Sequence, residues 1–149
     1  MEKVTLYFDM DGTIANLYAV DGWLADLEAH NTRPYEEAKV MHNMSTLARL
    51  LNKAQSNGYR IAIISWLSKD STQEYKRAVR AAKMSWLNMH LPIVFDELHF
   101  VKYGTRKDYV AKDKNGILFD DSAEVRKYWR GISCDPAEVN IITILRSFI

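Results

Sequence analysis

The 149-residue sequence lacks the features that mark several classes of protein. It has one cysteine, Cys134, which excludes an intrachain disulfide and a multi-cysteine metal site. Its 20 basic and 19 acidic residues give a net charge of +1, which argues against a nucleic-acid backbone or a membrane surface as partner. No apolar run approaches the roughly 18 residues of a membrane-spanning helix. We therefore expect a cytoplasmic protein in which any electrostatic function is local.

The sequence does contain enough apolar surface for one globular domain. It is 48% hydrophobic over 149 residues, which suffices for one core and leaves no room for a second full domain. The first apolar run begins at about Val4, so we expect no signal peptide ahead of it.

Five short apolar segments are predicted to form strands, with helical patterns between them. The strand segments are residues 4–9, 59–65, 97–103, 116–121 and 131–134. The clearest helical patterns cover residues 44–58 and 71–90. This alternation predicts an α/β fold, a doubly wound, Rossmann-like parallel sheet of about five strands with helices on both faces. In such sheets a ligand binds beyond the carboxyl ends of the strands.

The pattern also predicts the faces and ends of two helices. In the helix over residues 71–90, the residues expected to face inward are Tyr75, Ala78, Val79, Ala82, Trp86 and Leu87. Near the C-terminus, Asp135, Pro136 and Glu138 have the spacing of an N-cap, a first helical position and a capping-box acid. We expect a helix to open there and to continue through Phe148.

The regular alternation is interrupted between residues 16 and 43. This segment is too long for a simple connection, and it shows helical patterns around residues 18–28 and 35–41. We interpret it as a small lid, inserted into a single domain of residues 1–149 and lying over the strand ends.

Polar residues at the ends of the predicted strands form a pattern. Asp9 and Asp11 follow the first strand, Ser65 ends the second, and Asp120 and Asp121 end the fourth. At roughly 4 Å separation and an effective dielectric of about 20, each pair of carboxylates repels by about 4 kcal/mol, so the group needs a cation or shifted pKa values. Mg²⁺, a hard cation that prefers oxygen ligands, meets that need best. No cluster of histidines or cysteines indicates zinc.

Turns and caps offer a simpler interpretation of the same acids. Asp11-Gly12 is a good turn signal, and the "DDS" at residues 120–122 can cap a following helix. Each explanation works alone. Independent turns and caps give no reason for the acids to gather at one edge of a sheet, so we favour a functional site.

Four motifs resemble those of the haloacid dehalogenase-like (HAD) superfamily. They are "DMDGT" at residues 9–13, the Ser65 that ends "IAIIS", a downstream lysine, and "LFDDS" at residues 118–122. The resemblance spans nearly the whole chain and keeps the motifs in order. It implies a phosphomonoester hydrolase in which Asp9 attacks phosphorus and forms an aspartyl-phosphate, while Asp11 acts as general acid and then as general base.

The same resemblance implies a Mg²⁺ site. The metal would be held by the Asp9 carboxylate, the Met10 backbone carbonyl and Asp120. Asp121 would act through water or as an orienting group.

The resemblance further implies that Ser65 and the Thr13 hydroxyl bind phosphoryl oxygens, and that a lysine offsets the charge that builds up on them. The candidate lysines are Lys102, Lys107, Lys112 and Lys114. We choose Lys107, because "GTRKDYV" at residues 104–110 looks like the start of a helix just beyond the third strand. Lys102 is the second choice.

Within the superfamily, "DMDGTIANL" at residues 9–17 is most similar to the 5′(3′)-deoxyribonucleotidases and related small nucleotidases. This implies (deoxy)nucleoside monophosphates as substrates. The sequence departs from these enzymes in its much shorter insertion between the first two motifs, where their substrate-selecting cap lies. The aromatic residues that we expect to stack on a base are Tyr18, Trp23, Tyr35 and Trp66. Trp66 is preferred because it follows Ser65.

Three other functions remain open. A phosphatase of the same superfamily could act on a sugar phosphate or on a nucleic-acid 3′-phosphate. A receiver-like signalling domain also combines acids, a hydroxyl residue and a lysine at strand ends, but there the acidic pair comes before the phosphoacceptor. A non-catalytic phosphate-binding domain is disfavoured because all the reactive groups are present.

Overall fold

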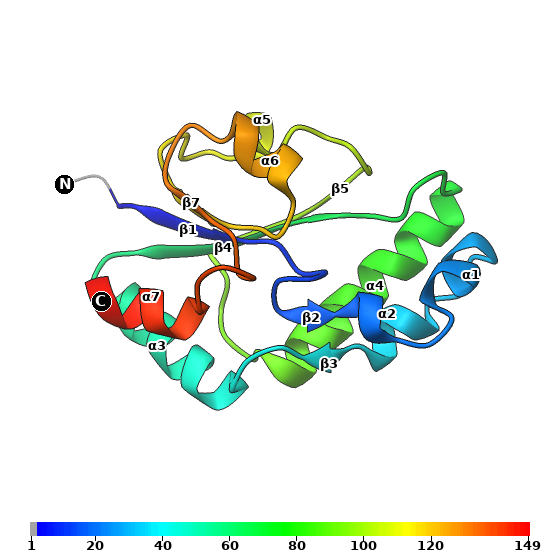
Figure 1. Cartoon of the computed structure of the whole chain (residues 1–149), viewed down its shortest axis with the longest axis horizontal. Coiled ribbons are helices and arrows are strands. Elements are labelled where there is room, and N and C mark those ends of the chain that lie inside the picture. Colours follow the sequence, from blue (N-terminus) through cyan, green and yellow to red (C-terminus); the bar gives the residue numbers. More distant parts are fainter. Residues whose placement is uncertain (1–2) are drawn as a thin grey trace.

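A computed structural model describes residues 3–149 of the chain. Its centre is a five-stranded parallel sheet in the order β5-β4-β1-β6-β7 (Figure 1). The strands are β1 (Thr5–Phe8), β4 (Arg60–Trp66), β5 (Glu97–Val101), β6 (Ile117–Phe119) and β7 (Ser133–Cys134). The predicted α/β, Rossmann-like sheet is confirmed, and each strand lies in the segment that the apolar pattern indicated, except that β4 extends one residue further, to Trp66.

Helices cover both faces of this sheet. They are α3 (Met44–Ser56), α4 (Gln73–His90), α5 (Lys107–Val110), α6 (Ala123–Tyr128) and α7 (Ile141–Phe148). Figure 1 shows α3 and α7 on one side of the sheet and α5 and α6 on the other. No helix within residues 3–149 has the length and apolar character needed to cross a membrane.

Alternate residues of the central strand β1 face two separate cores, as expected for a strand buried on both sides. Leu6 and Phe8 belong to the larger core, which includes side chains of α3, α4 and α7. Tyr7 belongs to the smaller core, where its ring and that of Trp129 form a T-shaped pair with 5.3 Å between centroids. β1 is therefore anchored from both faces, and this fixes the point at which it ends.

The sheet register brings the residues after β1 and β6 side by side. Phe8, the last residue of β1, pairs with Ile63 of β4 and with Phe119 of β6. The amide of Asp9 then donates to the carbonyl of Phe119 at 3.0 Å. Backbone pairing alone therefore places Asp9 next to the first residue after β6, which is Asp120.

Two helix predictions are wrong in detail. The "DPAE" segment forms a turn in which the amide of Glu138 donates to the carbonyl of Asp135. The C-terminal helix instead begins at Ile141, because the side chain of Asn140 caps it by accepting from the amide of Thr143 at 3.0 Å. In α4, Ala78 is exposed, contrary to the expectation that it faces inward. The buried face of that helix includes Lys83 instead.

Residues 15–43 form a second small unit of structure. Its elements are β2 (Ala15–Asn16), the 3₁₀ helix η1 (Leu17–Ala19), α1 (Trp23–Glu28), α2 (Arg33–Glu37) and β3 (Lys39–Val40). β2 and β3 pair as antiparallel strands. The helical pattern expected around residues 18–28 is present as η1 and α1. The one around residues 35–41 is wrong from Lys39 onward, where the chain forms β3.

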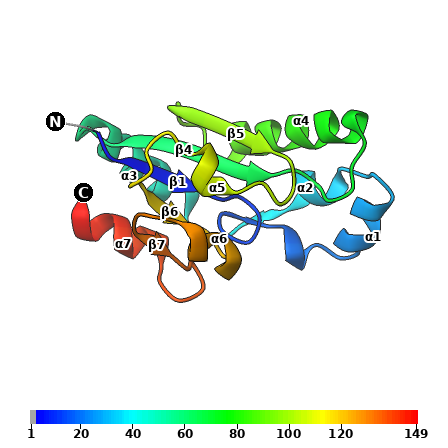
Figure 2. The same ribbon diagram turned by 90° about the horizontal axis from the view of Figure 1, so that it is seen from above.

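This segment lies beyond the ends of β1 and β4, the side toward which both strands point (Figure 2). It is fastened to α4, because the indole of Trp86 donates to the carbonyl of Ala38 at 2.7 Å and the hydroxyl of Tyr75 donates to the carbonyl of Asn31 at 2.8 Å. Helix α1, in contrast, contains no buried residue. The segment therefore has a fixed base in α2 and a weakly packed outer helix.

Candidate active site

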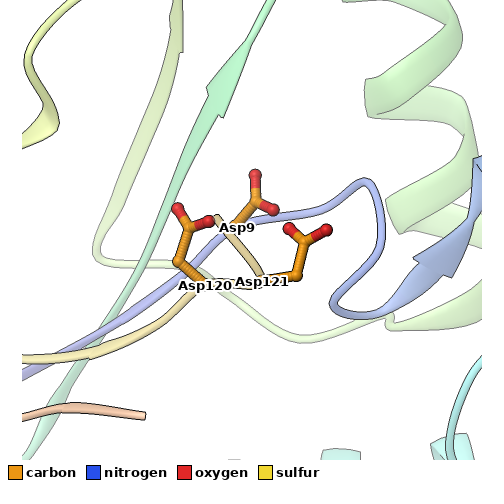
Figure 3. A group of neighbouring side chains, drawn as sticks. All are labelled: Asp9, Asp120 and Asp121. Carbon is orange, nitrogen blue, oxygen red and sulfur yellow. The ribbon is translucent and has the colours of Figure 1, made fainter. Parts of the chain in front are cut away.

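Three carboxylates meet at the carboxyl edge of the sheet. Asp9 follows β1, and Asp120 and Asp121 follow β6. Figure 3 shows their side chains gathered at one place, and one oxygen of each lies within 4.8 Å of the others. Asp120 is 1% exposed and Asp9 is 7% exposed, so their charges are poorly solvated. The structure thus brings together three of the acids that the sequence singled out.

This crowding raises the pKa of two of these carboxyl groups. Burial, reinforced by the charge of Asp9, raises the pKa of Asp120 to about 6 in spite of the opposing charge of Lys107. Burial raises the pKa of Asp121 to about 8, with a hydrogen bond and the charge of Asp9 as the next causes. When Asp9, Asp120 and Asp121 are all ionised, they carry more negative charge than the single ammonium of Lys107 balances. These donors fit a hard divalent cation such as Mg²⁺.

Lys107 supplies positive charge from within the chain. Its ammonium donates to Asp9 Oδ1 at 2.9 Å and to Asp120 Oδ2 at 2.7 Å. Burial alone would lower the pKa of Lys107, but the two carboxylates outweigh it and the pKa is raised. Lys107 is the first residue of α5, as the helix-start pattern predicts. Lys102, the second choice, is exposed, so the geometry favours Lys107.

The loop after β1 shapes the site through Gly12 and Thr13. Gly12 has φ +80°, a left-handed conformation that a side chain strains. A Cβ at this position would also come within 2.2 Å of Asp121 Oδ2, so Asp121 occupies the space that glycine leaves. The Thr13 hydroxyl donates to Asp9 Oδ2 at 3.2 Å. Both oxygens of Asp9 therefore accept a hydrogen bond from the chain.

The loop does not support the expected role of Met10. Its carbonyl oxygen accepts from three backbone amides, those of Thr13, Ile14 and Ala15, at 3.1, 2.9 and 3.0 Å. This oxygen is turned into the loop, and three amides already compete for its lone pairs. The metal-ligand role of the Met10 carbonyl therefore stays a prediction, and this hydrogen-bonding argues against it.

Asp11 and Ser65 are joined by a residue that the sequence pattern did not single out, Lys83 of α4. Its ammonium donates to Asp11 Oδ2 at 2.9 Å and to Ser65 Oγ at 2.7 Å. Burial raises the pKa of Asp11, and the charge of Lys83 opposes the shift. The signal that would have found Lys83 is its position: a lysine occurs where the helical spacing calls for an inward residue.

A cavity of about 630 Å³ opens above these groups. Its floor includes Asp9, Asp11, Lys107, Asp120 and Asp121. Its apolar and aromatic lining residues are Leu17, Tyr18, Trp23, Leu24, Leu27, Tyr35, Trp66, Leu67, Tyr103 and Val125. The other lining residues are polar or charged: Glu28, His30, Ser68, Lys69, Asp70 and Ser122. The cavity therefore combines a charged floor with a wall that is partly apolar and aromatic and partly polar.

The four aromatic residues singled out from the sequence all line this cavity, but they are held differently. The indole of Trp66 donates to the carbonyl of Thr105 at 2.8 Å and packs against Tyr103. Tyr35 is 5% exposed, and its hydroxyl is hydrogen-bonded to Ser68. Tyr18 is 52% exposed, with its ring against that of Trp23. Tyr18 is thus free to contact a ligand, whereas Tyr35 is packed into the protein.

Comparison with known proteins gives a likeness of fold only. No family model and no curated protein matches the chain. Among solved structures, the chain is similar to D,D-heptose 1,7-bisphosphate phosphatase from Burkholderia thailandensis, with 12% sequence identity and a TM-score of 0.48. The match covers 84% of this chain and 70% of the phosphatase.

Proposed function

We propose that the protein is a Mg²⁺-dependent phosphomonoester hydrolase that works through an aspartyl-phosphate on Asp9. The observation that carries this proposal is the ammonium of Lys107, which joins buried Asp9 to buried Asp120 at the floor of the cavity. A carboxylate held in this way keeps a fixed direction of attack. The ammonium of Lys107 can also stabilise the negative charge that develops on the transferring phosphoryl group.

The reaction divides into two displacements. In the first, an oxygen of Asp9 bonds to phosphorus as the ester P–O bond breaks, and Asp11 gives its proton to the departing oxygen. In the second, water attacks the phosphorus of the aspartyl-phosphate while Asp11 takes a proton from it. Phosphate leaves and the Asp9 carboxylate is restored. Burial raises the pKa of Asp11, and this shift favours the protonated form that a proton donor requires.

Asp9, Asp120 and Asp121 would hold the metal, since they form the acidic cluster at the floor of the cavity. Mg²⁺ at this place supplies charge that stabilises the transferring phosphoryl oxygens. The Met10 carbonyl is already engaged, whereas the carbonyl of Asp11 accepts no hydrogen bond within residues 3–149. We therefore propose that the carbonyl of Asp11, rather than that of Met10, is the backbone ligand of the metal in this loop.

Binding of the phosphoryl group is assigned to Ser65, Thr13 and Lys107. Ser65 is fully buried at the end of β4, on the strand next to that of Asp9. The Thr13 hydroxyl already donates to Asp9 Oδ2, and the Lys107 ammonium donates to Asp9 Oδ1. Thr13 and Lys107 thus place two donors at the attacking carboxylate, and Ser65 is proposed to add a third donor from the neighbouring strand.

The substrate we propose is a nucleoside monophosphate, with a deoxynucleotide preferred. The aromatic wall supports this choice, because a base can stack on Trp66 or Tyr18 while its phosphate meets the acidic floor. A sugar phosphate would leave the aromatic part of this wall without a stacking partner. Segment 16–43 would act as a lid over the bound nucleotide, with α1 as its movable part because α1 has no buried residue.

The proposal is tested by measuring phosphate release from deoxynucleoside, ribonucleoside, sugar and aryl monophosphates. Each is assayed with Mg²⁺ and with EDTA, and Asp9→Asn protein serves as control. Mg²⁺-dependent release that favours deoxynucleotides is expected. Release from aryl phosphate alone would overturn the substrate assignment but keep the chemistry. No release from any ester would overturn the proposed activity.

A further inference from the structure

Lys83 stands out because it is a buried lysine in the middle of a long helix. It is 1% exposed, and it lies on the inward face of α4 beside Val79, Trp86 and Leu87. An ammonium at such a position has to find hydrogen-bond acceptors inside the protein. Its neighbours on the helix face are apolar, so those acceptors come from other elements.

The acceptors are three, one for each proton of the ammonium. Besides Asp11 Oδ2 and Ser65 Oγ, the Lys83 ammonium donates to the carbonyl of Trp66 at 2.7 Å. The ring of Tyr35 covers it, with 5.1 Å between Nζ and the ring centroid. An ammonium has three donors and no acceptor. Lys83 therefore has no N–H left for a substrate, and any effect it has on the reaction passes through its partners.

The bond to Ser65 decides what the serine hydroxyl can do. Because Lys83 can only donate, Ser65 Oγ must accept, and the one O–H proton of Ser65 is left to point elsewhere. Within residues 3–149 that proton has no acceptor. Ser65 is thereby prepared as a donor toward an incoming acceptor such as a phosphoryl oxygen.

The bond to Asp11 acts in the same way on the carboxyl group. Oδ2 is held by a donor, so a proton carried by Asp11 belongs on Oδ1. Asp11 lines the cavity, and its Oδ1 accepts no hydrogen bond in the part of the chain that the structure describes. One oxygen is thus fixed for orientation and the other is left for proton transfer.

We propose that Lys83 is a positioning residue of the phosphoryl-transfer site, which turns the proton of Asp11 toward the leaving group and the hydroxyl of Ser65 toward the phosphate. The assignment rests on the proposed function, since it concerns the same two displacements. It differs from the role of Lys107, whose ammonium contacts the attacking carboxylate itself.

The test compares two esters that differ in their need for an acid. An alkyl phosphate requires protonation of its leaving oxygen, whereas 4-nitrophenolate leaves without it. For Lys83→Met, we expect kcat/KM to fall about 100-fold for the alkyl ester and about 10-fold or less for the aryl ester, because general acid catalysis contributes on that scale. Lys76→Met, the same change on α4 outside the cavity lining, should leave both values unchanged.

The results distinguish the positioning role of Lys83 from the proposed phosphatase activity. Equal losses for the two esters in folded Lys83→Met protein would reduce Lys83 to a packing role and overturn this assignment alone. A wild-type protein that releases phosphate from neither ester with Mg²⁺ present would overturn the proposed function, and this assignment with it.

A second comparison covers the case in which Lys83→Met does not fold. Asp11→Asn and Asp11→Asn/Lys83→Met proteins contain no unpaired carboxylate at this position. In that background, where the aspartyl-phosphate is not hydrolysed, the rate of leaving-group release in a single turnover is measured. We expect Lys83→Met to lower this rate by the same factor for both esters, because only the Ser65 effect remains. A further loss confined to the alkyl ester would contradict the proposed route through Asp11.

Discussion

The Lys107 ammonium lies 2.9 Å from Asp9 Oδ1, although the two residues are 98 positions apart in the sequence. The same ammonium contacts Asp120 at 2.7 Å, and Asp121 completes the acidic group. This arrangement sets the expected response of the protein to substitution, to pH and to Mg²⁺.

Lys107→Met should lower both stability and activity. It leaves buried Asp9 and Asp120 without their shared partner, a type of loss that costs about 3–5 kcal/mol. We expect denaturant unfolding to detect this loss in EDTA and to find part of it recovered in Mg²⁺. Phosphate release should fall by about 100-fold or more. Lys102→Met, at an exposed position, is the control. Full activity in Lys107→Met would contradict the assignment.

Gly12→Ala should weaken Mg²⁺ binding beyond its effect on the backbone. The control is Gly58→Ala, since both glycines have positive φ, +80° and +96°. A methyl group at Gly12 meets Asp121 Oδ2 at 2.2 Å, whereas nothing lies within 4 Å at Gly58. Both variants should lose about 1–2 kcal/mol through left-handed strain. Only Gly12→Ala should also lose about tenfold or more in Mg²⁺ affinity, measured by calorimetry. Equal affinities would argue against Asp121 as part of the metal site.

Stability without metal should fall as pH rises. The pKa values of Asp120 and Asp121, about 6 and about 8 in the folded protein against 3.8 ordinarily, mean that the folded state holds more protons than the unfolded state between these limits. The free energy of unfolding therefore declines from about pH 4 to about pH 8.

Saturating Mg²⁺ should remove this decline, because it binds the ionised carboxylates of the folded state only. Urea titrations at several pH values, with Mg²⁺ or EDTA, measure the effect. Asp121→Asn should flatten the metal-free profile above about pH 6. A metal-free protein that gains stability over this range would contradict the account of the cluster.

Tyr18→Ala should affect nucleotides selectively. Tyr18 is 52% exposed at the cavity wall, so its truncation removes a stacking surface without opening the core. Loss of one stacked base costs about 1–3 kcal/mol, so KM for a deoxynucleotide should rise about 5-fold or more. KM for a phosphoester without a base should stay the same. An equal change in KM for both substrates would indicate that the base binds elsewhere in the cavity.

The sequence predicts the sheet well, because its apolar runs alternate with helical patterns and parallel strands bring their ends to one edge. For that reason the meeting of Asp9, Asp120 and Asp121 follows from the amino-acid pattern alone. Lys107 is indicated by a local helix-start pattern. Each of these inferences depends on the order of elements along the chain.

The features that the sequence does not predict depend on directions and on distant partners. The Met10 carbonyl turns into its own loop, and no residue pattern indicates where a carbonyl points. The C-terminal helix is capped by Asn140 rather than opening at "DPAE", since both segments carry capping signals and packing decides between them. The sequence pattern does not indicate the role of Lys83, because its partners, Asp11 and Ser65, lie on other elements.

The central claim, a phosphoryl group carried by Asp9, is tested most directly by trapping it. Asp11→Asn protein is mixed with 4-nitrophenyl phosphate and Mg²⁺, quenched in acid and digested, and the peptides are weighed by mass spectrometry. Because this variant keeps the nucleophile but lacks the base that activates water, we expect one added phosphoryl group on Asp9, removable by hydroxylamine. A phosphoryl group on another residue, or normal turnover by Asp9→Asn protein free of contaminating phosphatase, would contradict the account.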